Sequence, residues 1–161
     1  MAIKVGDKIP SVTLRYLTPE GVKAVPSEEF FAGKKVVVFG LPGAYTRTCS
    51  SRHLPGYVTN AAALQAKGID AVACLSVNDA FVMGAWAKDQ HAARKVRMMG
   101  DGSAAYIKAL GLDLDLTARG MGVRCQRFSA LVEDGVVKAL NIEAPGKFEV
   151  SGAETMLKQL R

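Results

Sequence analysis

Hydrophobic and polar residues follow two different periods along the chain, and these periods predict a succession of strands and helices. A continuous apolar run at residues 35–40 is typical of a strand covered on both faces, a second buried strand is expected at 69–77, and a short strand is expected at 96–100. Each is followed by a segment with apolar positions at helical spacing, at about 49–67, 81–86 and 104–110. Alternating strands and helices predict a parallel sheet at the centre of the fold.

Antiparallel hairpins are expected on both sides of this centre. Residues 8–16 and 22–25 flank the turn signal Thr18-Pro19-Glu20-Gly21, and patterned runs at 123–132 and 136–142 flank Asp134-Gly135, a strong hairpin signal. A last helix is expected over 152–160. This order matches an α/β, thioredoxin-like sandwich in one domain over residues 1–161. It has an N-terminal β-hairpin, a mixed central sheet covered by helices, and a closing antiparallel hairpin.

Local signals predict further details of these elements. Ser27 is expected to cap a short helix, because Glu28 and Glu29 follow it in the first turn. Pro55 is expected to kink the helix that begins at Cys49. Residues 111–122, which contain three glycines, are interpreted as an ordered loop.

Composition and charge narrow the function classes. The apolar content of 49% argues against disorder, and no apolar run approaches the ~20 residues that a membrane span needs. The N-terminus resembles neither a signal peptide nor a transit peptide, so a cytoplasmic location is expected, or an organellar matrix if a transit peptide was removed. The net charge of +6 is spread along the chain, and its densest cluster, residues 94–97, is interpreted as a solvated helix end. No membrane or nucleic-acid partner is therefore expected, and a docking surface for an acidic partner is the alternative reading of that cluster.

The three cysteines, Cys49, Cys74 and Cys125, indicate reduced thiols rather than a secreted disulfide framework. Their spacing contains no C-x-x-C pair, and Pro55 stands where a phosphatase-like C-x5-R loop needs its arginine. Cys74 lies within an apolar strand and is interpreted as structural. Gly120-Met121-Gly122 lacks the third glycine of a dinucleotide fingerprint, and no cofactor is expected.

Cys49 is the candidate nucleophile because it follows a buried strand and a tight turn, Pro42 to Thr48, and begins a helix. Backbone N–H groups and the helix dipole favour a thiolate there. Thr46 can place its hydroxyl near the sulfur, and Pro42 can help to exclude water. His53, four residues further on, is expected to form hydrogen bonds at the edge of the site rather than to bind a metal, because no further ligands are near in sequence.

Two arginines are candidates for the cation that such a thiolate needs. Arg124 and Arg127 both lie in the expected strand 123–132, three residues apart, so their side chains are expected on opposite faces. Only one of them can then face Cys49, and the pattern does not say which.

The segment from Pro42 to Cys49, Pro-x-x-x-Thr-x-x-Cys, resembles the signature of the peroxiredoxins. With Ser50 and His53-Leu54-Pro55-Gly56-Tyr57, it is similar to the atypical type-5, or plant type-II, subgroup, and the likeness covers essentially the whole chain. It implies a thiol peroxidase that reduces hydrogen peroxide and alkyl hydroperoxides, with Cys49 oxidised to a sulfenic acid. It also implies that Thr46 contacts the reacting oxygens, that Pro42 shields the pocket, that Arg127 is the arginine of the site, and that the chain forms a homodimer.

The chain departs from the subgroup at two places. Tyr45 and Arg47 stand where the subgroup usually has Phe and Pro, and residues 148–152 hold no resolving cysteine. Cys74 matches a cysteine of many members, whereas Cys125 has no role implied by the resemblance. An external thiol, either glutathione with glutaredoxin or thioredoxin, is therefore expected to resolve the sulfenic acid. The alternatives are a peroxide-sensing redox relay or interaction protein that uses the same thiol, and a binding module with an inert Cys49.

Overall fold

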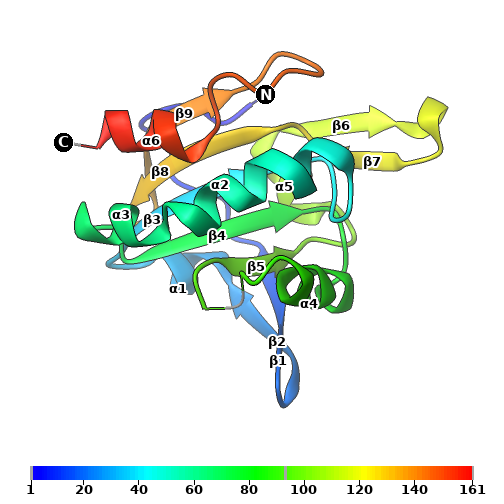
Figure 1. Cartoon of the computed structure of the whole chain (residues 1–161), viewed down its shortest axis with the longest axis horizontal. Coiled ribbons are helices and arrows are strands. Elements are labelled where there is room, and N and C mark those ends of the chain that lie inside the picture. Colours follow the sequence, from blue (N-terminus) through cyan, green and yellow to red (C-terminus); the bar gives the residue numbers. More distant parts are fainter. Residues whose placement is uncertain (1, 93, 161) are drawn as a thin grey trace.

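A seven-stranded mixed sheet runs through the molecule in a computed structural model, which describes residues 2–92 and 94–160 (Figure 1). Its strand order is β2-β1-β5-β4-β3-β8-β9. The strands are β1 (Thr13–Thr18), β2 (Gly21–Pro26), β3 (Lys35–Gly40), β4 (Ala71–Ser76), β5 (Arg97–Gly100), β8 (Phe128–Glu133) and β9 (Val136–Ile142). Strands β3, β4 and β5 are parallel to one another, and the β1–β2 and β8–β9 hairpins pair antiparallel, so the predicted thioredoxin-like α/β fold with two hairpins is confirmed.

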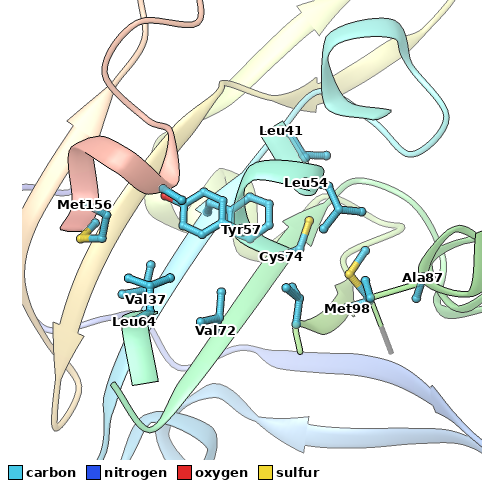
Figure 2. Packing of buried hydrophobic residues seen from close by; sticks show 14 of the residues in the cluster. Val37, Leu41, Leu54, Tyr57, Leu64, Val72, Cys74, Ala87, Met98 and Met156 are labelled. Carbon is cyan, nitrogen blue, oxygen red and sulfur yellow. The ribbon is translucent and has the colours of Figure 1, made fainter. Parts of the chain in front are cut away.

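Helices cover both faces of this sheet, and each face has its own apolar cluster. The helices are α1 (Ser27–Phe31), α2 (Leu54–Thr59), α3 (Ala61–Ala66), α4 (Ala80–Asp89), α5 (Ala105–Leu110) and α6 (Ala153–Gln159). Val37 and Phe39 of β3 pack in the cluster that includes α2, α3, α4 and α6, whereas Val36 and Val38 pack in the cluster that includes α1 and α5. The uninterrupted apolar run of β3 follows from this arrangement, because both faces of the strand are buried. Figure 2 shows the first cluster, with Tyr57 and Cys74 among its side chains.

Segment 111–133 differs most from the prediction. Residues 111–122 are not an ordered loop throughout: β6 (Asp113–Leu116) pairs antiparallel with β7 (Gly122–Cys125), with a 3-10 turn, η2 (Thr117–Arg119), between them. The expected continuous strand 123–132 is also wrong, because it breaks into β7 and β8 at residues 126 and 127. The β6–β7 ribbon extends away from the main sheet (Figure 1).

Two helix predictions need correction as well. Ser27 does not cap α1: its hydroxyl donates to the Pro10 carbonyl at 2.6 Å and accepts from the Val12 N–H at 3.0 Å, so it joins α1 to the segment before β1. The helix expected from Cys49 to about Lys67 has three parts, a π-helical turn η1 (Cys49–His53), α2 and α3. The change from π to α geometry lies just before Pro55, but the break at Asn60 was not predicted.

Candidate active site

Cys49 lies at the carboxyl end of β3, after the turn formed by residues 41–48, and its side chain is fully buried. The turn is fixed from two sides. The Ala44 N–H donates to Asn78 Oδ1 at 2.9 Å, at the end of β4, and the Tyr45 hydroxyl donates to Asp89 of α4 at 2.7 Å. Tyr45 therefore forms a hydrogen bond to α4 through its hydroxyl, a group that the Phe expected at this position from the resemblance would lack. The thiol directly follows a turn that is held by neighbouring strand and helix ends, the usual position of active sites in α/β sheets.

Arg127 brings a cation to the sulfur. Its Nη2 donates to Cys49 Sγ at 3.3 Å, and its Nη1 donates to His53 Nδ1 at 2.9 Å. A guanidinium can only donate, so His53 Nδ1 must be unprotonated and the ring proton must lie on Nε2. Nε2 then donates to the Ser151 carbonyl at 3.0 Å. One guanidinium thus contacts the candidate nucleophile and is oriented by a neutral histidine.

His53 is buried rather than at the edge of the site as expected. Burial and the Arg127 charge lower the pKa of His53 to about 3, so the ring is neutral at physiological pH. The expected hydrogen-bonding role is present: both ring nitrogens have partners. A neutral ring orients Arg127 without cancelling its charge, as a carboxylate would.

Glu143 fixes the other end of this chain of contacts. Its carboxylate accepts from the N–H groups of Glu149, Val150 and Ser151 and from the Ser151 hydroxyl, at 2.7–2.9 Å. Burial opposes ionisation of this carboxyl, but the hydrogen bonds from Ser151 and the backbone outweigh it and lower the pKa of Glu143. Sequence reasoning missed Glu143 and Ser151; a Glu directly after a patterned strand was the available signal.

Of the two arginines, only Arg127 has a hydrogen bond to Cys49 in the described part of the chain, and Arg124 reaches the turn before Cys49 instead. Its Nη1 lies 3.4 Å from the Pro42 carbonyl, and its Nε donates to the Met121 carbonyl at 2.9 Å. Arg124 belongs to β7, whereas Arg127 lies in the break between β7 and β8, so strand alternation does not relate them. Gly43 leaves room for Arg124, since a Cβ there would lie 2.7 Å from Nη1.

The remaining predicted residues have different surroundings. The Thr46 hydroxyl donates to the Gly43 carbonyl at 2.7 Å, and no hydrogen bond in the described part of the chain joins it to Cys49. Pro42 is half-buried in the same turn, and Arg47 is exposed. No group of three His, Cys, Asp or Glu side chains within residues 2–92 and 94–160 is arranged to hold a metal ion.

The other two cysteines are buried and reduced. Burial raises the pKa of both the Cys74 and Cys125 thiols well above the ordinary value, so both stay protonated. Cys74 packs among apolar side chains (Figure 2). The Cys125 Sγ–H donates to the Gln126 carbonyl at 2.9 Å. Cys49 has a cationic hydrogen-bond partner, Arg127, whereas neither of these two thiols has one among the described residues.

A cavity of about 350 Å³ opens beside Arg127. Its walls come from the turn, the helix of Cys49 and the segment after β9: Pro42, Thr48, Arg52, Leu114, Gln126, Arg127, Glu143, Ala144, Pro145, Gly146, Lys147 and Phe148. The cavity joins the solvent to the guanidinium that touches the sulfur. None of the helices described is both long and apolar enough to cross a membrane.

A family model described as Redoxin matches residues 4–157. Peroxiredoxin-2E, chloroplastic, of Arabidopsis thaliana is 50% identical over 99% of this chain and 70% of its own length. Peroxiredoxin-2F, mitochondrial, of the same plant is 49% identical over 88% of this chain and 73% of its own length. A crystal structure of reduced Prx3 in complex with H₂O₂ from Vibrio vulnificus is 51% identical, covers 99% of both chains and has a TM-score of 0.95.

Proposed function

The chain belongs to the peroxiredoxin family and is a thiol peroxidase, and we propose that Cys49 is its nucleophile and Arg127 the cation that serves it. The observation that carries this proposal is the pair of contacts of Arg127, 3.3 Å to Cys49 Sγ and 2.9 Å to His53 Nδ1. A fixed guanidinium favours the thiolate and the charge that develops on the peroxide oxygens. Thr46 and Pro42 are proposed to border the bound peroxide.

The first half-reaction is proposed to run as follows. The Cys49 thiolate attacks one oxygen of hydrogen peroxide or an alkyl hydroperoxide, the S–O bond forms and the O–O bond breaks. The leaving oxygen takes a proton and departs as water or an alcohol, and the sulfur is left as a sulfenic acid. Arg127 would stabilise the negative charge as it moves from sulfur to the leaving oxygen.

The second half-reaction needs a thiol from outside the chain. Cys74 and Cys125 are buried and protonated, so neither is well placed to resolve the sulfenic acid. An external thiol, glutathione with glutaredoxin or thioredoxin, would condense with it to a mixed disulfide and release water. A second thiol would then displace Cys49 and regenerate it.

Substitution of the cysteines tests this assignment. Cys49→Ser should abolish peroxide consumption, whereas Cys74→Ser should retain most of it, measured with glutaredoxin/glutathione and with thioredoxin side by side. Mass spectrometry after one equivalent of peroxide should find a sulfenic acid or its adduct at Cys49. Equal losses in the two variants, or a dominant internal disulfide, would contradict the proposal.

A homodimer is proposed from the surface beside the active-site turn. Phe81 is 66% exposed and Tyr45 is 53% exposed. Phe81 lies two helical turns before Asp89 on α4, and Asp89 accepts the Tyr45 hydroxyl, so the two aromatic rings border one surface. Sedimentation of the wild type and of Phe81→Glu should show a dimer and a weakened dimer, respectively. A wild-type monomer at micromolar concentration would refute the assembly.

The reaction is proposed to take place in the cytoplasm, with an organellar matrix as the alternative. The relatives named chloroplastic and mitochondrial motivate that alternative. Fractionation of the source cells, followed by detection of the chain in each fraction, distinguishes the two.

A further inference from the structure

The cavity beside Arg127 carries an excess of positive charge. Three of its lining side chains are cationic, Arg52, Arg127 and Lys147, and one, Glu143, is a carboxylate. The Glu143 oxygens already accept hydrogen bonds from the backbone of residues 149–151. The cavity therefore has a net charge of +2, from three cations and one anion.

Arg52 and Lys147 are available to bind an anion. The two ion pairs found in the described part of the chain, Lys23–Glu20 and Lys35–Glu133, involve neither of them. Arg127, by contrast, is occupied by Cys49 and His53. The Arg52 guanidinium lies 4.8 Å from the centre of the Phe148 ring, which holds it at the cavity wall without neutralising it.

The two available cations come from two segments that lie far apart in the sequence. Arg52 belongs to the η1 turn, and Lys147 belongs to the segment after β9. Apolar groups of Pro42, Leu114 and Phe148 also line the cavity. A ligand with separated anionic groups and a short apolar or peptide body matches this distribution, and about 350 Å³ is within the range of small-molecule sites.

We propose that this cavity binds the carboxylates of a small anionic thiol, which reduces the sulfenic acid of Cys49. The inference rests on the proposed function, because it needs Cys49 to be oxidised by peroxide. The thiol sulfur attacks the sulfenic sulfur, an S–S bond forms, and the S–O bond breaks with release of water after the oxygen takes a proton. A second molecule of the thiol then displaces Cys49 as a thiol and leaves as the symmetric disulfide.

Access to the sulfur is a separate step from binding of the carboxylates. The Cys49 side chain is fully buried in the reduced protein. Attack by a thiol of this size therefore requires a shift of Arg127 or of the η1 turn, whereas Arg52 and Lys147 are already exposed. The cations would raise the local concentration of an anionic thiol before that shift takes place.

The test compares three thiols that differ in charge. Glutathione carries two carboxylates and one ammonium, 2-mercaptoethanol is neutral, and cysteamine is a cation. The double variant Arg52→Gln/Lys147→Gln removes both charges and keeps unbranched, polar side chains. Arg94→Gln/Lys95→Gln is the matched control, since these two exposed cations line a different groove between α3 and β5.

Stopped-flow measurements separate the two half-reactions. In the double variant, mixed-disulfide formation with glutathione should slow about tenfold and lose most of its dependence on salt. The rate with 2-mercaptoethanol should stay the same, that with cysteamine should rise, and the control variant should behave as the wild type. An unchanged glutathione rate, an equal loss with all three thiols, or the same loss in the control variant would overturn the proposal. Failure of wild-type Cys49 to react with peroxide at all would instead refute the proposed function.

Discussion

His53 makes the stability of the protein depend on pH in a window that its surroundings define. Burial and the charge of Arg127 lower the pKa of His53 from 6.5 to about 3 in the folded state. The unfolded chain therefore binds one more proton than the folded chain between about pH 6.5 and 3. The stability is fully present above pH 6.5 and is lost progressively as the pH falls toward 3.

The magnitude follows from the width of the window. A pH of 5 lies about 1.5 units below the pKa of His53 in the unfolded chain. Each unit corresponds to about 1.4 kcal/mol of the free energy of unfolding. Acidification from pH 7 to 5 should thus lower the free energy of unfolding by about 2 kcal/mol through His53 alone. This is a large part of the total stability of a typical domain.

Urea unfolding at pH 7 and at pH 5 measures the contribution of His53 as the difference between the wild type and a variant that lacks the imidazole. The variant His53→Gln cannot titrate in this range, so its free energy of unfolding should fall by about 2 kcal/mol less than that of the wild type. Carboxylates such as Glu143 titrate in both proteins and cancel. His91→Asn is the control, because His91 is exposed, and it should follow the wild type. The same loss in wild type and His53→Gln would refute a neutral, buried His53.

Two further substitutions test the packing around the site. Glu143→Gln places an amide N–H₂ among backbone donors and should lower the free energy of unfolding, measured in urea, by about 2–4 kcal/mol. The control Glu149→Gln lies at an exposed position and should change this free energy little. Equal effects of the two substitutions would contradict a structural role for Glu143. Gly40→Ala would place a Cβ 2.2 Å from a Phe128 ring carbon and should cost about 1–3 kcal/mol or more. The control Gly56→Ala, where a Cβ meets no atom within 4 Å, should be neutral or stabilising in thermal melts. A larger loss of stability from Gly56→Ala than from Gly40→Ala would show that crowding does not cause the loss.

The hydrophobic pattern was sufficient for the central part of the fold. A strand covered on both faces must be apolar at every position, so residues 35–40 could be identified without knowing their neighbours. Asp134-Gly135 fixed the closing hairpin, because both residues adopt positive φ in the turn. The prediction of a loop over residues 111–122 failed because β6 and β7 pair only with each other in the described sheets. The residues of β6 alternate between exposed and half-buried. Such a ribbon leaves little hydrophobic signal.

Part of the candidate site was predictable from closeness in the sequence. Cys49, Thr46 and Pro42 lie in one short segment, so their proximity is dictated by the chain itself. Asn78 could be placed near them, since it follows β4 and the carboxyl ends of parallel strands meet at one edge. Glu143 and Ser151 act through backbone donors of a segment without regular structure, and no periodicity marks such contacts.

The two arginines show where reasoning from strand alternation stops being valid. Alternation of side chains holds only while the backbone stays extended and paired. The chain leaves the β6–β7 ribbon after Cys125 and enters β8 at Phe128, so Arg124 lies in β7 and Arg127 lies in the break itself. Arg124 reaches the Pro42 carbonyl, and Arg127 reaches Cys49. The break thus allows two guanidinium groups to approach one turn. A continuous strand would have directed one of them to the opposite face of the sheet.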